Sequence, residues 1–312
     1  MGTPEFAVPT LEALISAQSV HLVGVVVQPD RPAGRGQRLV LPPVKRAAQA
    51  HGVPSFQPSS LGTPEAVARL ATWEPDVIVV AAFGQILKQD VLDLPVHGCL
   101  NVHASLLPRW RGAAPIPAAI LAGDEVTGVT IMRMDAGLDT GPILAQREEP
   151  IRPGDTWATL EARLAQLGAE LLVSTLPVYL AGDLLPRPQP EQGVTYAGQL
   201  RKEDGLLDWS RPAIELERQV RAFQPWPGAF TTLRGQRLKV VRAVPLAGWR
   251  GDAPPGTVVA LDDGGAIAVA TGEGALYLEE VQLAGRRSMD IAAFLCGQPD
   301  CVGSRLGLRE RE

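Results

Sequence analysis

The sequence predicts an α/β protein in which a domain built on a mostly parallel sheet is followed by a small C-terminal β-barrel. Apolar runs that alternate with amphipathic stretches in the first half predict βαβ units. Short apolar stretches at a spacing of roughly ten residues, punctuated by Gly and Pro, predict the barrel. The length of 312 residues favours two domains, because single cores stop growing below roughly 250–300 residues.

Strands of the first half are expected where the apolar runs are short. The second and third of these runs are nearly continuous, as in strands that are covered on both faces. Helices are expected between them, several with a Pro near the first turn, where its missing N–H does no harm. The predicted strands are 21–27, 76–82, 99–103 and 129–134, and the predicted helices are 9–18, 43–51, 64–73 and 115–122.

The longest predicted helix covers residues 155–176, because its leucines recur on one stripe of the surface. Asp155 is expected to cap its N-terminus. Residues 182–193 then hold three Pro and two Gly, which predicts a linker. The expected division is a catalytic domain over 1–181, a linker over 182–198 and a barrel domain over 199–312.

The barrel is expected to consist of short strands with one helix before them and one after. The predicted strands are 229–233, 237–244, 257–261, 266–270 and 275–283, and the predicted helices are 212–223 and 289–295. This pattern is typical of an OB-fold-like barrel, and the first half is typical of a Rossmann-like sheet.

The start of the chain departs from that pattern. A doubly wound sheet normally begins with a strand that enters its first helix through a tight turn, but this chain starts inside the turn, at Met1-Gly2-Thr3-Pro4. We therefore expect the first strand to be missing from the sheet.

Composition narrows the class of protein. The net charge is −5, no apolar run reaches the ~20 residues that span a bilayer, and the N-terminus lacks a secretory pattern. Three Cys without metal-ligand spacing suit a reducing compartment. We expect a cytoplasmic protein with no membrane association and no metal.

Polar residues at strand ends form the candidate active site. Asn101 and His103 lie two apart at the carboxyl end of a buried strand, where open α/β sheets place their ligands, and so point to one face. Asp139 follows a later strand in the turn GLDTG. Taken singly, His103 could be structural and Asp139 a turn former. Together they suit acyl transfer, since an imidazole moves protons and an amide donates to an oxyanion.

The site lacks a nucleophile of its own. There is no G-x-S-x-G elbow and no Cys beside His103, so a covalent acyl-enzyme is not indicated. A substrate amine is the expected nucleophile.

Six segments resemble the formyltransferase family that uses 10-formyltetrahydrofolate, and the resemblance runs over nearly the whole chain. They are GTPEFAVPTLEAL at 2–14, QPDRPAGRG at 28–36, NVHASLLPRWRGAAPI at 101–116, GVTIMRMDAGLDTGP at 128–142, RKEDGLLDWS at 201–210 and RAFQPWPGA at 221–229. Three stretches are closer to the members that act on methionine esterified to initiator tRNA, namely QPDRPAGRG, WRGAAPI and PWPGA. Family members also carry an apolar strand ahead of the first segment.

The resemblance implies roles for individual residues. Asn101, His103 and Asp139 match the catalytic trio, with Asn101 donating to the oxyanion and Asp139 orienting His103 and favouring its charged form. The family's folate-contacting loop matches Ser105, Leu106, Leu107 and Pro108. The implied reaction takes the formyl group from 10-formyltetrahydrofolate, releases tetrahydrofolate and formylates methionyl initiator tRNA; we expect a monomer.

A basic loop is the expected contact with tRNA. Residues 28–46 carry five Lys or Arg against one acid, a local positive field that suits phosphates although a solvated loop could have the same composition. By the resemblance, this loop enters the acceptor end of the tRNA. The predicted tRNA-binding residues are Arg31, Arg35, Arg38 and Lys45.

The sequence leaves alternatives open for the roles of residues in the second half and for the function of the protein. Arg237 and Lys239 would share a face of one strand, and Trp209 and Trp226 could stack on bases or pack in a core. The alternative functions are formyl transfer to a small amine, such as glycinamide ribonucleotide or an amino sugar nucleotide, and non-catalytic RNA binding. The basic loop and the barrel disfavour the small amine, and the intact trio disfavours pure binding.

Overall fold

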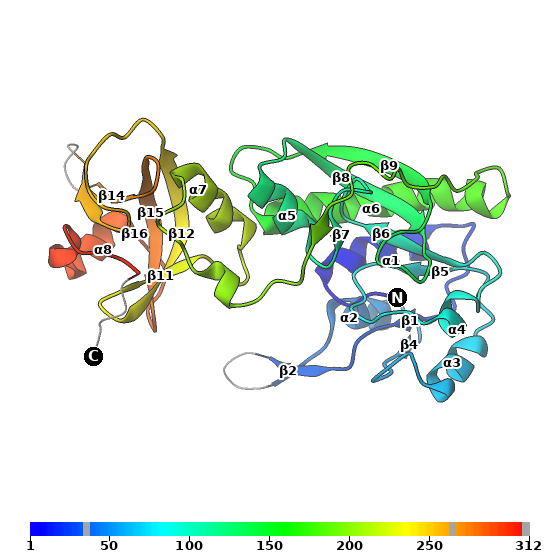
Figure 1. The fold of residues 1–312 in the computed structure, drawn as a ribbon. Helices are drawn as coiled ribbons and strands as arrows, with labels where there is room; N and C mark the ends of the chain where they lie inside the picture. Colours follow the sequence, from blue (N-terminus) through cyan, green and yellow to red (C-terminus); the bar gives the residue numbers. More distant parts are fainter. Residues whose placement is uncertain (34–37, 262–265, 308–312) are drawn as a thin grey trace. The chain divides into compact units, whose positions relative to one another are not determined.

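The computed structural model describes residues 1–33, 38–261 and 266–307 of the chain (Figure 1). They group into two compact parts. The first comprises residues 1–115, 125–151 and 160–198, and the second comprises 116–124, 152–159 and 199–312.

The first part contains short strands and several helices. Its strands are β1 (Val25–Val26), β2 (Arg31–Ala33), β3 (Arg38–Val40), β4 (Ser55–Phe56), β5 (Ile78–Val80), β6 (Cys99–His103), β7 (Arg111–Gly112), β8 (Val126–Arg133), β9 (Ile143–Pro150) and β10 (Tyr196–Ala197). Its helices are the 3-10 turn Glu5–Ala7, α1 (Val8–Ser16), α2 (Pro43–Ala50), α3 (Pro64–Ala71), α4 (Gln89–Leu92) and most of α6 (Trp157–Leu180), whereas α5 (Pro115–Ala122) groups almost entirely with the second part.

The sheet of the first part is mixed, so the expectation of a mostly parallel sheet is corrected. β1 pairs with β4, and β5 with β6, in parallel. β8 runs antiparallel to β6, with His103 opposite Thr130, and β9 runs antiparallel to β8. The pairing of β8 with β9 has a local reason, since the loop 134–142 joins them as a hairpin, and a hairpin cannot place its strands in parallel.

Met1 and Gly2 lie between β1 and β5. The Gly2 N–H donates to the Val26 carbonyl, and the Ala81 N–H donates to the Met1 carbonyl. An apolar cavity of about 380 Å³ adjoins them. Its lining includes Leu11, Leu14, Val23, Val25, Trp73 and Val77. The buried Thr10 hydroxyl, which also lines the cavity, has no hydrogen-bond partner among the described residues.

Helix α6 packs directly on the strand that carries the candidate site. A Cβ at Gly168 would lie 2.7 Å from Val102 of β6, so only glycine permits this approach of helix to sheet. Asp155 precedes the first turn of α6. Its carboxylate accepts from the Arg152 N–H and the Thr159 hydroxyl, while Thr156 and Thr159 exchange side chain to backbone hydrogen bonds in the first turn.

The second part is a sheet curled into a half-barrel, with helices packed against it. Its strands are β11 (Phe230–Leu233), β12 (Gln236–Leu246), β13 (Val258–Ala260), β14 (Ile267–Ala270), β15 (Ala275–Leu283) and β16 (Met289–Asp290), and its helices are α7 (Ala213–Ala222), α8 (Ile291–Gly297) and the 3-10 turns Glu203–Gly205 and Pro299–Cys301. The order is β11-β12-β15-β14-β13, and β16 pairs with β15. Its core holds Trp209, Leu216, Leu238, Leu276 and Val281.

The segment predicted as a linker pairs with the first part along much of its length. Arg187 exchanges two backbone hydrogen bonds with Ile143, and β10 pairs in parallel with β7. We call residues 187–197 the strap. No helix in the described ranges is long and apolar enough to cross a membrane.

The three thiols differ in reactivity. Cys99 and Cys301 are buried and Cys296 is exposed. Burial raises the pKa of the Cys99 thiol to about 12 and also raises the pKa of the Cys301 thiol, so the reactive thiolate is scarce at both sites.

We expect a water-soluble thiol reagent at pH 8 to modify one Cys per native molecule and all three after denaturation. Mass spectrometry of the labelled peptides should place the native label on Cys296, and Cys296→Ser should remove it. Rapid native labelling of Cys99 would contradict this assignment.

Candidate active site

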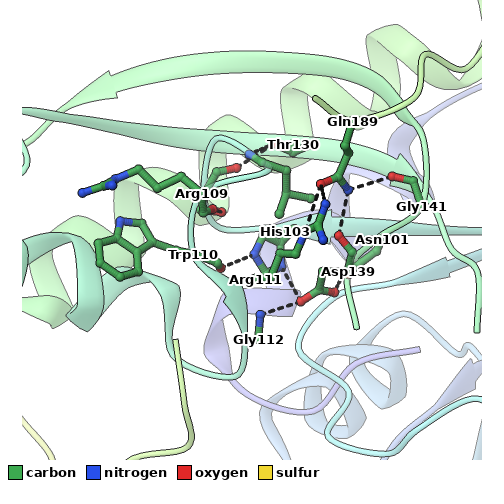
Figure 2. Close-up of polar contacts among 12 residues, drawn as sticks. Asn101, His103, Arg109, Trp110, Arg111, Gly112, Thr130, Asp139, Gly141 and Gln189 are labelled. Carbon is green, nitrogen blue, oxygen red and sulfur yellow. Dashed lines mark hydrogen bonds and ion pairs between the residues drawn. The ribbon is translucent and has the colours of Figure 1, made fainter. Parts of the chain in front are cut away.

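Asn101 and His103 lie on the same side of β6, at its carboxyl end (Figure 2). His103 is 6% exposed. Its Nε2 lies 3.0 Å from the Trp110 carbonyl oxygen, and its Nδ1 lies 3.7 Å from Asp139 Oδ2. Both ring nitrogens therefore face oxygen acceptors, one on each side of the ring.

Asp139 reaches the same place from the loop between β8 and β9. Its Oδ2 accepts the Gly112 N–H at 2.7 Å, and its Oδ1 lies 3.5 Å from the Asn101 Nδ2. Its backbone has φ 51°, in the left-handed region that few residues other than glycine adopt. The structure thus brings the three predicted catalytic side chains together.

A buried hydrogen-bond network shapes the loop that follows β6. Ser105 is fully buried, and its hydroxyl donates to the Arg109 carbonyl at 2.6 Å. The Thr130 hydroxyl donates to the Ser105 carbonyl and accepts from the Leu107 N–H. Ser105 and Leu107 point inward, so the parts of the predicted folate loop open to a ligand are the half-buried Leu106 and Pro108.

The strap supplies residues of this site that sequence reasoning missed. The Thr195 hydroxyl accepts from the Trp110 N–H at 2.8 Å. Gln189 contacts Arg111 on one side, and the carbonyls of Asp139 and Gly141 on the other. Nothing in the local sequence marks Gln189, because a Gln between two prolines is the composition of a linker.

The predicted tRNA-binding residues occupy different surroundings. Arg31 is exposed at the start of β2, which pairs with β3, the strand that holds Arg38. Arg35 lies outside the described residues. Lys45 is mostly buried and forms an ion pair of 2.7 Å with Asp30. Hydrogen bonds from Lys45, and then from Gln57, hold the pKa of the Asp30 carboxyl below its ordinary value.

Two arginines of the second part make contacts with other side chains. The Arg237 guanidinium lies 3.6 Å from the centre of the Phe230 ring, and Arg242 pairs with Glu279. Trp209 is 5% exposed and packs in the core, whereas Trp226 is 44% exposed. Stacking on a base is therefore open to Trp226 and not to Trp209.

The geometry defines a class of enzyme. An imidazole, a carboxylate and a carboxamide converge at the end of a strand in an α/β sheet, and no Ser or Cys nucleophile is among the described residues of this group. Such a site is suited to acyl transfer onto a nucleophile that arrives with the substrate. The described residues contain no group of three His, Cys, Asp or Glu that could hold a metal ion.

The chain belongs to the formyl transferase family. The family domain matches residues 1–176, and the formyl transferase C-terminal domain matches residues 199–299. Methionyl-tRNA formyltransferase of Thiobacillus denitrificans is 56% identical to it over 98% of both chains. That of Myxococcus xanthus is 52% identical over 98% of this chain and 96% of the relative.

Solved structures share the fold. An N-formyltransferase from Helicobacter canadensis, solved with folinic acid and dTDP-3-aminofucose, has a TM-score of 0.63 at 17% identity and covers 89% of this chain and 96% of that one. HypX from Aquifex aeolicus with tetrahydrofolic acid has a TM-score of 0.56 at 24% identity, over 75% of this chain and 41% of that one.

The turn that carries Asp139 should be sensitive to added volume at Gly141. A Cβ there would overlap the Arg133 carbonyl oxygen, a backbone atom that cannot rotate away. We expect Gly141→Ala to lower the free energy of unfolding by about 1–3 kcal/mol, as overpacking does.

Denaturant unfolding would measure this cost. Gly198→Ala is the matched control, because a Cβ at Gly198 meets nothing within 4 Å. Equal unfolding free energies for the two variants would contradict the close contact between Gly141 and the Arg133 carbonyl oxygen.

Proposed function

We propose that the protein transfers the formyl group of 10-formyltetrahydrofolate to the free amino group of methionyl initiator tRNA. The products are N-formylmethionyl-tRNA, for translation initiation, and tetrahydrofolate. The observation that carries this proposal is the 52–56% identity to methionyl-tRNA formyltransferases over both parts of the chain. The convergence of Asn101, His103 and Asp139 supports it chemically.

In this proposal the substrate amine attacks the formyl carbon directly. The Asn101 amide donates to the oxygen that becomes negative as the carbon turns tetrahedral. His103 either donates to that oxygen or takes the proton that the amine loses. Asp139, 3.7 Å from the ring, orients His103 for either task. The bond from the carbon to the folate nitrogen then breaks, and that nitrogen gains a proton, which balances the one lost by the amine, to leave as tetrahydrofolate.

The folate co-substrate is assigned to the loop at 105–108, through Leu106 and Pro108. Leu106 and Pro108 offer half-buried apolar surface beside the trio. Ser105 and Leu107 support that surface from beneath, since their side chains are buried.

The RNA substrate is assigned to both parts of the chain. Arg31 lies on β2 and Arg38 on β3, and Arg35 falls between them in the sequence. These arginines are proposed to attract the tRNA phosphates, together with Lys45, whose charge is partly offset by its ion pair with Asp30. The curved sheet within residues 199–312 is proposed to be an OB-fold-like RNA-binding surface, joined to the catalytic residues 1–181 by 182–198. We expect a cytoplasmic monomer.

Removal of the imidazole or of the carboxylate should abolish catalysis. We expect His103→Ala and Asp139→Ala to lower kcat for formylation of charged initiator tRNA by about 10²–10⁴-fold, because the first removes the general acid–base group and the second removes the carboxylate that orients it. The measurement is single-turnover formylation, with tRNA binding followed separately and expected to persist.

The same assay discriminates the alternatives. Transfer by the wild type to glycinamide ribonucleotide or an amino sugar nucleotide, with none to tRNA, would show a small-amine enzyme. Binding of tRNA without any transfer would show an RNA-binding protein. Normal turnover by both variants would remove His103 and Asp139 from the mechanism.

The basic loop at residues 28–46 should serve tRNA alone. We expect Arg35→Ala to raise KM for methionyl-tRNA, to leave KM for the folate unchanged, and to reduce the slope of log affinity against log salt by about one. Titration of tRNA binding over a range of salt concentrations checks this. An equal loss of affinity for both substrates would refute the assignment of the loop 28–46 to tRNA binding.

A further inference from the structure

Gln189 joins the two loops that form the candidate active site. Its Oε1 accepts from Arg111 Nε at 3.1 Å and from a terminal Arg111 nitrogen at 2.7 Å. Its Nε2 donates to the Asp139 carbonyl at 2.7 Å and to the Gly141 carbonyl at 2.8 Å. Figure 2 shows the amide between the guanidinium and the turn that carries Asp139.

These four hydrogen bonds use the full capacity of a carboxamide, which has two acceptor lone pairs and two donor hydrogens. They also fix its orientation. A reversed amide would set its hydrogens against the guanidinium hydrogens, and its oxygen against two carbonyl oxygens. Gln189 is therefore specific as an amide, because no other uncharged side chain of this length both donates and accepts in pairs.

The turn at Asp139 needs such support. A left-handed backbone at a residue other than glycine costs of order 1–3 kcal/mol and persists only where its surroundings hold it. Gly112 holds the carboxylate of Asp139, and Gln189 holds its backbone carbonyl. Both ends of the residue are thus tied, and the carboxylate has one position relative to His103.

The strap presents Gln189 in a fixed position. Pro188 and Pro190 restrict the backbone on either side of it. Arg187 exchanges two backbone hydrogen bonds with Ile143, and β10 pairs with β7 just beyond. The amide is consequently supplied by a segment that is itself anchored at both ends.

We propose that Gln189 is a positioning residue for formyl transfer, which acts by holding Asp139 in register with His103. It touches no reacting atom in this role. The inference rests on the proposed function, because it assigns a residue to that reaction.

Two substitutions separate the donor side of Gln189 from its acceptor side. Gln189→Glu keeps an acceptor for Arg111 but places an oxygen against the two carbonyls, and Gln189→Met removes both sides at similar length. Gln192→Met is the matched control, because Gln192 is an exposed residue of the same strap. The full chain is used throughout, and kcat, both KM values and the melting temperature are measured.

We expect kcat to fall roughly ten- to a hundredfold in both Gln189 variants, as small misplacements of catalytic groups do. Both KM values should stay within about twofold of the wild type, because a purely transition-state defect leaves substrate binding intact. The Gln192 variant should match the wild type. Gln189→Glu should also keep its melting temperature, since a carboxylate can pair with Arg111.

Three results would overturn the inference. Wild-type kcat in Gln189→Glu would mean that the residue only braces Arg111. An equal loss in the Gln192 variant would mean that any change in the strap disturbs the enzyme. A wild-type protein without formyl transfer would overturn the proposed function as well, whereas an active wild type with an active Gln189→Glu overturns this inference alone.

Discussion

The hydrogen bond from the Gly112 N–H to the Asp139 carboxylate, 2.7 Å long, joins the two loops around the candidate active site. Only 14% of the Asp139 side chain is exposed, and a carboxylate this far from water is costly unless it is hydrogen-bonded. Asn101 and His103 face the same carboxylate from β6. Much of the geometry of both loops follows from the need to place this one charged group beside the strand.

Buried polar side chains fix the conformation of the loop that follows β6. The hydroxyls of Ser105 and Thr130, and the amide of Gln146, satisfy the backbone of the loop after β6. Since buried polar groups need partners, this loop has little freedom to adopt another course. The antiparallel pairing of β8 with β6 makes the network possible, because it sets Thr130 opposite His103.

Local signals in the sequence predicted the elements that depend on local patterns. β6 and α5 have the predicted bounds, and the position of Asn101 and His103 follows from their spacing on a strand. β9 was missed because much of it is charged and exposed. The role of Gln189 could not be predicted, because its partners are 48 to 78 residues away in the chain and no local periodicity encodes them.

The strap has a consequence for how the enzyme is made. A ribosome synthesises residues 101–139 well before residues 187–197, so the nascent chain contains Asn101, His103 and Asp139 before it contains Gln189. Contacts of such sequence separation form late, since loop closure must precede them. A fragment that ends at residue 181 would likewise retain Asn101, His103 and Asp139 but lack the hydrogen bonds from Gln189 to the Asp139 and Gly141 carbonyls. The hydrogen bonds from Gln189 to the Asp139 and Gly141 carbonyls can therefore form only after the three candidate catalytic residues have been synthesised.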